Sequence, residues 1–156
     1  MKAKVFQEHL EKNIIPFWNQ MTDFEKGGFY GYADSDGKPV KDSVKGCILN
    51  SRILWFYAAS YQLLKKPELL EKADHAYQFL AEHFYDSRYG GMFWSVQADG
   101  TPEDTTKHTY NQAFAIYALS VYYQASGKKE ALNLSYSLYQ IIESKCRDHE
   151  GPIFEG

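Results

Sequence analysis

This 156-residue chain has few of the features that mark whole classes of proteins. Its two cysteines, Cys47 and Cys146, are too far apart in the sequence to suggest a disulfide framework or a zinc site. It has no apolar run long enough for a signal peptide or a transmembrane helix, so we expect a cytoplasmic protein without a membrane partner. The net charge of −3 comes from mixed charges, which leaves no basic footprint for nucleic acid.

The motifs of common catalytic and metal sites are missing as well. The chain contains no nucleophile elbow, phosphate-binding loop or metal-ligand cluster. Asp34–Gly37 is similar to the start of a calcium loop, but the twelfth position counted from Asp34 is Lys45 instead of a glutamate. We therefore expect no metal and no cofactor.

What the chain does contain is an internal repeat of about sixty residues. The segment Lys45–Asp86 can be laid on Lys107–Asp148 without a gap, a glycine-rich turn precedes each copy, and Asp148–Gly156 begins a third. Repeats of this length are typical of stacked helical pairs that cannot bury their apolar faces alone. Eight identical pairs support the alignment: Lys45/Lys107, Tyr61/Tyr123, Gln62/Gln124, Lys66/Lys128, Glu68/Glu130, Leu70/Leu132, Tyr77/Tyr139 and Asp86/Asp148.

Hydrophobic periodicity predicts five helices of alternating character. Three have one apolar stripe, as expected of helices that face water, and two are apolar on almost every side, as expected of helices with neighbours all round. The one-stripe helices are predicted at about Lys4–Trp18, Pro67–Phe84 and Lys129–Cys146, and the others at about Gly46–Leu64 and Thr109–Ala125. This order predicts an all-α fold, the arc of an α/α toroid with the apolar helices inside. Short β-hairpins with tips at Asp36-Gly37 and Asp99-Gly100 are expected to join outer to inner helices.

Arg52 is the first candidate site residue, because it is the only full charge between Lys45 and Lys65, within a predicted inner helix. A buried guanidinium must reach an anion, a cavity or carbonyl groups. Two interpretations are open. Arg52 points into the mouth of the toroid and donates to substrate oxygens, or it pairs with a core carboxylate or caps carbonyl groups.

Tyr110 and Asn111 are the next candidates, at the start of the other inner helix. In the repeat alignment they replace Ile48 and Leu49, so a polar pair stands where the first copy is apolar. This predicts groups presented to a central pocket; the alternative is that Thr109 or Asn111 caps the helix and Tyr110 packs. The thirteen tyrosines of the chain exceed what a dry core needs and suit wet polar cavities such as sugar sites.

Together, four segments of this sequence resemble the N-acylglucosamine 2-epimerase family. The likeness covers essentially the whole chain and keeps the order of the motifs. It implies an (α/α)6 barrel of roughly 400 residues, of which residues 1–156 would form the first two and a half helical-pair repeats, an incomplete domain. The segments are Ile14–Trp18, Gly27–Gly31, Ser51–Phe56 and Tyr110–Leu119.

The resemblance also implies a reaction. Members of the family invert C2 of a reducing-end sugar, such as cellobiose or an amino sugar, by ring opening and by removal and return of the C2 proton, without metal or nucleotide. The family's arginine falls on Arg52, which would hold and polarise the charged oxygen of the intermediate. Its tyrosine falls on Tyr110, which would hydrogen-bond the sugar, and Asn111 and Trp55 would be wall residues. The family's catalytic histidines, glutamate and stacking tryptophans would fall in later repeats, after Gly156, so we expect the isolated chain to be inactive.

Two other classes of protein stay open. Another α/α-toroid carbohydrate enzyme, such as a glycoside hydrolase, would need a carboxylate pair flanking the scissile bond, and the sequence shows none. A non-catalytic arc would expose the sides of its inner helices and would self-associate through that open edge.

Overall fold

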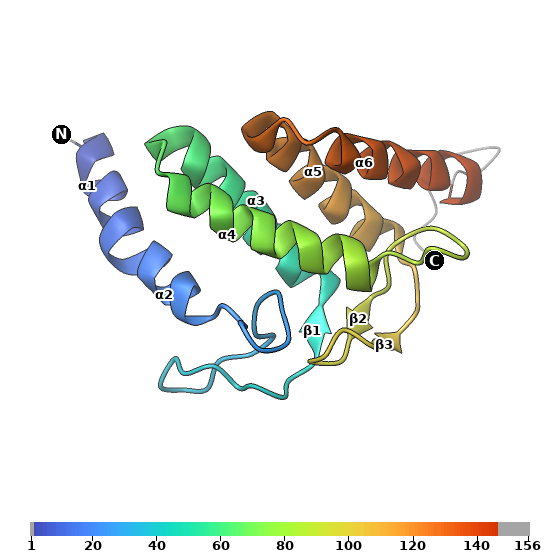
Figure 1. Cartoon of the computed structure of the whole chain (residues 1–156), viewed down its shortest axis with the longest axis horizontal. Helices are drawn as coiled ribbons and strands as arrows, with labels where there is room; N and C mark the ends of the chain where they lie inside the picture. Colours follow the sequence, from blue (N-terminus) through green and yellow to red (C-terminus); the bar gives the residue numbers. More distant parts are fainter. Residues whose placement is uncertain (1, 147–156) are drawn as a thin grey trace.

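The computed structural model describes residues 2–146 and shows outer helices alternating with inner ones (Figure 1). The predicted third copy at Asp148–Gly156 lies outside these residues. Each outer helix contains a π-helical turn, labelled η. In chain order the helical elements are α1 (Lys2–His9), η1 (Leu10–Ile14), α2 (Ile15–Gln20), α3 (Cys47–Leu64), α4 (Pro67–Phe79), η2 (Leu80–Phe84), α5 (Thr109–Ser126), α6 (Lys129–Ile141) and η3 (Ile142–Cys146).

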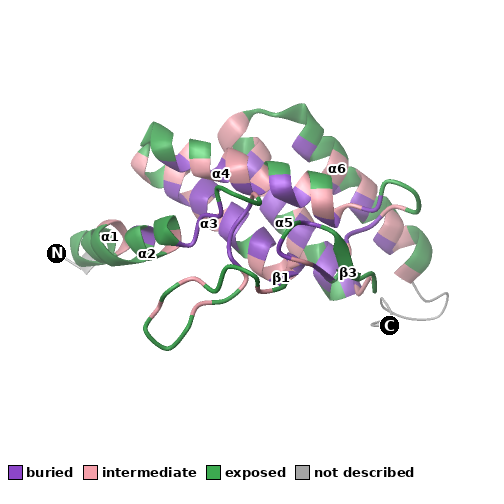
Figure 2. Ribbon diagram, turned by 60° about the horizontal axis from the view of Figure 1, so that its bottom comes forward, coloured by how far each residue is buried: buried purple, intermediate pink, exposed green. Residues whose placement is uncertain are grey.

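The inner helices α3 and α5 pack against each other, and α4 and α6 cover them from outside. Buried residues concentrate on the inner helices, as Figure 2 shows, and Leu54, Tyr57, Leu119 and Tyr122 are fully buried. The predicted all-α arc, with the two nearly all-apolar helices inside, is therefore confirmed.

The ends of the helices repeat at matching positions. Pro67 stands in the first turn of α4, where its missing N–H is not needed. The inner helices end at residues in the left-handed region, Lys65 after α3 (φ 56°) and Gly127 after α5 (φ 73°). A residue in the left-handed region of φ/ψ space ends a helix by turning the chain away from the helix axis. Glycine adopts this conformation without strain.

Three short strands gather at the end of the arc where both inner helices begin (Figure 1). They are β1 (Lys45–Gly46), β2 (Ser95–Val96) and β3 (Pro102–Asp104), antiparallel in the order β1-β2-β3, with Lys45 opposite Val96. β2 and β3 form the hairpin predicted around Asp99-Gly100. The turn at Asp36-Gly37 is closed by a single bridge between Ala33 and Pro39.

One expectation needs correction: the inner helices are not covered on every side. Arg52, Tyr110 and Tyr117 are exposed, the two tyrosines by 54% and 51%. An arc surrounds its inner helices only in part, so one side of them meets solvent within residues 2–146. None of the helices that the structure describes is both long and apolar enough to cross a membrane.

Candidate functional site

A repeated aspartate–lysine pair fixes the start of each inner helix. Lys45, immediately before α3, places its Nζ 2.8 Å from Asp23 Oδ2 and 2.7 Å from the Gly27 carbonyl oxygen. Lys107, just before α5, binds Asp86 in the same way at 2.5 Å. These contacts tie each glycine-rich turn to the helix that carries candidate site residues.

The hydrogen bonds in these pairs also set the charge of the carboxylates. Burial by itself would raise the pKa of Asp23, but the Lys45 ammonium and the N–H groups of Lys26 and Glu25 hold that pKa below its usual range. The Lys107 ammonium is the main cause that lowers the pKa of Asp86. Both aspartates are therefore ionised at neutral pH.

Arg52 lies exposed in the second turn of α3, where it lines a hollow of about 330 Å³. Among residues 2–146 it has neither an ion-pair nor a hydrogen-bond partner, so no core carboxylate or carbonyl cap is found for it. The other lining residues are apolar or aromatic: Trp18, Leu49, Ile53, Trp55 and Phe56. The guanidinium is thus the one titratable group of this hollow and is available to an anion or to sugar oxygens.

Trp55 is half-buried and joins the two inner helices. Its ring stacks on that of Tyr117, the residue at the same place in the second repeat, with ring centroids 5.7 Å apart and planes 20° apart. One face of the Trp55 ring is therefore occupied by Tyr117. The remaining surface belongs to the hollow beside Arg52.

Tyr110 and Asn111 are adjacent in sequence but lie in different surroundings. Tyr110 is exposed, and its ring rests edge-to-face on Phe114 with centroids 4.8 Å apart. Asn111 is fully buried, and its Nδ2 donates to the carbonyl oxygens of Phe93 at 2.9 Å and Met92 at 3.2 Å. Asn111 therefore lies behind the exposed surface and holds the glycine-rich turn.

Asn111 does not cap α5. The residue before the helix is His108, which makes no side-chain capping bond, and Asn111 uses its amide on the turn. Gln112 supports the same turn, because its Nε2 donates to Met92 O at 2.9 Å and its Oε1 accepts from Met92 N at 2.7 Å. The start of α5 is thus held by amide side chains bonded to the preceding loop.

Cys47, the first residue of α3, is buried beside Ser51 and Asn111. Burial raises the pKa of its thiol to about 12, against the weaker effect of hydrogen bonds from those two neighbours. The thiol is therefore protonated at neutral pH and cannot act as a nucleophile.

The residue patterns did not single out two tryptophans, Trp18 and Trp94. Trp18 reaches the Arg52 hollow from α2, and Trp94 places its ring edge-to-face on that of His108, with centroids 4.9 Å apart. Trp18 ends a segment that carries the family resemblance. When Gly27-Gly28 of the first turn is laid on Gly90-Gly91 of the second, the residue that matches Trp94 is Gly31, so this comparison would have singled out Trp94.

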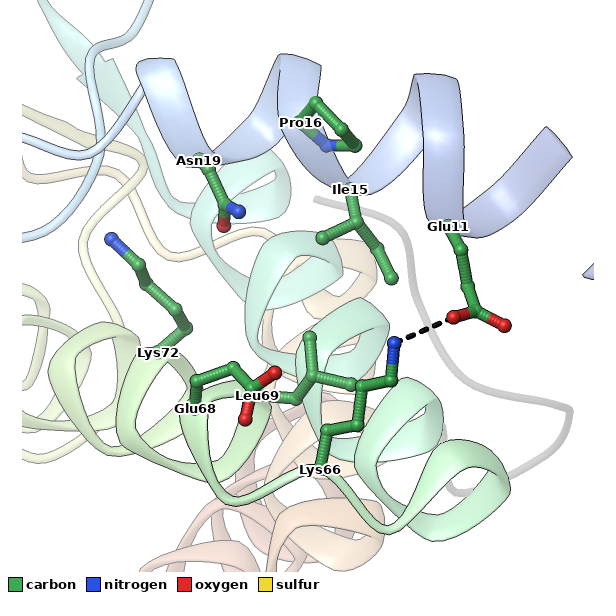
Figure 3. Close-up of a pocket in the computed structure, with 8 residues that line it drawn as sticks. All are labelled: Glu11, Ile15, Pro16, Asn19, Lys66, Glu68, Leu69 and Lys72. Atoms are coloured by element: carbon green, nitrogen blue, oxygen red, sulfur yellow. Dashed lines mark hydrogen bonds and ion pairs between the residues drawn. The ribbon is translucent and has the colours of Figure 1, made fainter. Parts of the chain in front are cut away.

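A second hollow, of about 230 Å³, lies on the outer side between the first helix and α4 (Figure 3). Its lysines are already engaged: Lys66 Nζ lies 2.6 Å from Glu11, and Lys72 Nζ donates to Thr22 Oγ1 at 2.8 Å. Within residues 2–146 no group of three or more His, Cys, Asp or Glu side chains is arranged to hold a metal. The Arg52 side is therefore the better candidate for a binding site.

These features define an arc of an α/α toroid whose inner helices present a guanidinium among aromatic rings. The chain belongs to the N-acylglucosamine 2-epimerase (GlcNAc 2-epimerase) family, whose model matches residues 28–155. It is 52% identical over 151 residues to a cellobiose 2-epimerase from Eubacterium cellulosolvens and 50% identical to one from Ruminococcus albus. The matches cover 97% of this chain but only 37% and 39% of those proteins.

Solved structures agree with this assignment. A sugar epimerase from a ruminal bacterium superposes with a TM-score of 0.94 at 49% identity, over 97% of this chain and 39% of that one. Cellobiose 2-epimerase from Bacillus thermoamylovorans B4167 gives a TM-score of 0.93 at 42% identity, over 96% and 39%. The predicted fold, the N-terminal part of an (α/α)6 barrel, is confirmed.

Proposed function

We propose that this chain forms the N-terminal part of the substrate site of a sugar 2-epimerase, which converts cellobiose to glucosyl-mannose by inverting C2 of the reducing-end sugar. The observation that carries the proposal is the exposed Arg52, without a partner among residues 2–146, in an aromatic hollow on an inner helix. The names of the relatives at 52% and 50% identity support the reaction and the disaccharide.

Arg52 has the chemistry that this reaction needs. Once the sugar ring opens, removal of the C2 proton beside the aldehyde leaves an enediolate, whose charge gathers on oxygen. A fixed guanidinium donates two parallel N–H groups to such oxygens and lowers the barrier most where the charge develops. A sugar bound against the apolar lining of the hollow displaces water from Arg52, which strengthens this interaction.

The other candidate residues take supporting roles in the same proposal. Tyr110, exposed in the first turn of α5, hydrogen-bonds a sugar hydroxyl. Trp55 forms part of the wall beside Arg52 through its stack with Tyr117. Asn111 contributes to the wall indirectly, because its amide fixes the Met92 and Phe93 carbonyl groups behind it.

In this proposal the acid and base of the reaction come from later repeats, so the chain alone is inactive. The Arg52 hollow contains no carboxylate or imidazole. Two of the histidines are engaged elsewhere: His75 Nε2 lies 2.8 Å from the Gly28 carbonyl oxygen, and His108 packs on Trp94. A proton must leave and return on opposite faces of C2, which requires groups that other repeats provide.

The test compares two proteins: the 156-residue chain and the product of the complete coding region. Each is incubated with cellobiose, and glucosyl-mannose is measured by chromatography, with Arg52→Ala made in the longer product. We expect product from the longer protein only, and almost none from its Arg52→Ala variant. Epimer formed by the 156-residue chain at a comparable turnover would refute its inactivity; a longer protein without activity would refute the epimerase assignment.

Self-association is a second proposal for the isolated chain, favoured by apolar residues on the outer helix α6. Leu132, Tyr136 and Tyr139 are exposed by 41%, 59% and 49% and recur at helical spacing on one face. Light scattering after size exclusion should show a mass above 18.0 kDa that falls on dilution. A mass that stays at one chain across concentrations would exclude this behaviour.

A further inference from the structure

The first helix, which runs from α1 to α2, lacks the partner that each later outer helix has. α4 packs mainly on α3, and α6 packs mainly on α5, so each of them covers the inner helix that precedes it in sequence. Within residues 2–146 no inner helix precedes α1, and the first helix forms one edge of the arc (Figure 1).

Two matching ion pairs fix the register between the first helix and α4. Glu11 pairs with Lys66, which follows the inner helix α3, and Asp74 pairs with Lys128, which follows the inner helix α5. Glu11 of the first helix therefore matches Asp74 of α4.

In this register an exposed phenylalanine matches a buried leucine. Phe6 matches Leu69, and the two residues are 74% and 2% exposed. Leu69 faces the preceding pair of helices, because it lines the hollow between the first helix and α4 (Figure 3). The same face of the first helix is turned to solvent at Phe6.

The inner helix α5 shows which of its faces the preceding pair covers. Asn111 hydrogen-bonds the thiol of Cys47 on α3, and the hydroxyl of Tyr122 donates to Asp74 on α4 at 2.5 Å. Between these two contacts the face contains only fully buried residues at helical spacing. The face consists of Asn111, Ala115, Ala118 and Tyr122.

The matching face of α3 is open and forms the apolar part of the Arg52 hollow. Its residues line that hollow of about 330 Å³, and Leu49 and Phe56 are only half-buried. The face that α5 turns to the preceding pair is therefore uncovered on α3. The matching residues are Leu49/Asn111, Ile53/Ala115 and Phe56/Ala118.

We infer that a further pair of helices docks on this edge of the arc, and that it comes from the part of a longer protein that follows residue 156. Its inner helix lies along Leu49, Ile53 and Phe56 of α3, and the pair also covers Phe6. We call these four residues the closing face, because a pair docked there joins the first helix to the end of the longer chain and closes a ring.

Two observations favour this occupant over a second copy of the chain. The closing face continues an interface that the described residues already repeat, in which a preceding pair covers the next inner helix. The chain spans only 37% and 39% of two cellobiose 2-epimerases, so a protein of their length has further pairs to supply. A pair on the same polypeptide also has a high effective concentration at this edge.

Docking fills the apolar part of the hollow and leaves its guanidinium open. Arg52 and Trp55 match Phe114 and Tyr117 of α5, which the preceding pair leaves half-buried and exposed. The docked helix therefore forms a wall beside Arg52 that residues 2–146 do not contain. This inference depends on the repeat and on no particular reaction, so it holds for whichever sugar the site binds.

The test compares the labelling of a cysteine at position 6 in this chain and in the product of the complete coding region. Phe6→Cys should react rapidly with a maleimide in this chain and about tenfold or more slowly in the longer protein. Mass spectrometry of the peptide that contains position 6 measures the rate. Phe24→Cys is the matched control, because Phe24 is 78% exposed in a turn outside the closing face, and it should react equally in both proteins.

Thermal unfolding gives a second, independent measurement. Phe6→Ala should lower the melting temperature of the longer protein by about 5 °C and that of this chain by less than about 1 °C. Leu69→Ala, at the matching position that is already buried in this chain, should lower the melting temperature of both proteins.

Three results would overturn the inference. Equal labelling of Phe6→Cys in the two proteins would show that nothing covers the closing face in the longer one. An unchanged melting temperature of the longer protein with Phe6→Ala would show the same. Protection in this chain that grows with its concentration would assign the closing face to a second copy. None of these measurements requires epimerase activity, so the inference and the proposed function can fail separately.

Discussion

Lys45 Nζ lies 2.8 Å from Asp23 Oδ2, and the two side chains are only 0% and 1% exposed. The equivalent pair of the second repeat, Lys107 with Asp86, is more open, with side chains 27% and 10% exposed. The same polar contact therefore recurs at the start of both inner helices, and in each copy it links the glycine-rich turn to the segment that leads into the inner helix.

Removing Lys45 should destabilise the protein far more than removing an exposed lysine. In Lys45→Met the Asp23 carboxylate stays buried without its counter-ion, which costs about 3–5 kcal/mol. Lys26→Met is the matched control, because Lys26 pairs with Asp42 at the surface. Such an exposed ion pair contributes at most about 1 kcal/mol to the free energy of unfolding. Urea unfolding measures both, and the double variant Asp23→Asn/Lys45→Met should recover most of the loss. Equal effects of the two single substitutions would contradict a structural role for the buried pair.

Stability should fall in acid because of the same pairs. The pKa values of Asp23 and Asp86 are lower in the folded protein than in the unfolded chain, so their contribution is complete above about pH 4, the unfolded value, and is lost as pH drops through the folded values. The urea concentration at the midpoint of unfolding, measured at pH 7, 5, 4 and 3, should be constant at the higher pH values and should then fall toward pH 3. The double variant Asp23→Asn/Lys45→Met should decline less, and an identical slope would show that Asp23 does not contribute.

The repeat also predicts a stabilising substitution at Asn50. Its Oδ1 is buried without a hydrogen-bond partner, whereas Gln112, the matching residue, uses its longer side chain to accept from Met92 N at 2.7 Å. Asn50→Gln should reach toward the corresponding turn residue, Phe29, and gain about 1 kcal/mol. The reciprocal Gln112→Asn should lose about 1–3 kcal/mol by leaving Met92 N unpaired. Thermal unfolding measures the stability of both variants. A lower melting temperature in both would mean that the turn around Phe29 cannot accommodate the longer amide side chain.

The C-terminal ends of the inner helices predict a second pair of substitutions, in which each repeat copy takes the residue type of the other. Lys65 takes the left-handed conformation that Gly127 takes in the next copy, so Lys65→Gly should raise the unfolding free energy by about 1 kcal/mol. Gly127→Ala should lower it by about 1 kcal/mol through conformation alone, since an added Cβ meets nothing within 4 Å. Lys65→Ala controls for the lost contact of Lys65 with the Tyr61 ring. Destabilisation by Lys65→Gly would show that this contact outweighs the strain.

Helices were the part of the fold that the sequence predicted best. The first was expected at Lys4–Trp18 and runs from Lys2 to Gln20. Its predicted apolar stripe was wrong as a guide to packing, because Phe6, Ile14 and Phe17 are exposed and Ile15 is buried. The π-helical turns and the pairing of β1 with β2 were not predicted. Strands of two residues carry no alternation, and β1–β2 pairing joins segments about fifty residues apart.

The candidate site was predicted only in part, for a related reason. Tyr110 and Asn111 are one helical step apart, and one is exposed while the other is buried. Hydrophobic periodicity cannot tell which of the two is buried, because α5 is apolar on nearly every side and has no single apolar stripe that would mark its buried face. For Arg52 the sequence located the charge within the inner helix, but its exposure depends on how far the arc surrounds α3.

The most direct test of the epimerase account is deuterium incorporation at C2 of the sugar. The product of the complete coding region is incubated with cellobiose in D2O, and both the recovered cellobiose and the glucosyl-mannose are read by proton NMR. We predict that deuterium enters C2 only, and that Arg52→Met lowers its rate of entry by about a hundredfold or more while the protein stays folded. Epimer formed without deuterium at C2, or undiminished exchange in Arg52→Met, would contradict proton abstraction assisted by Arg52.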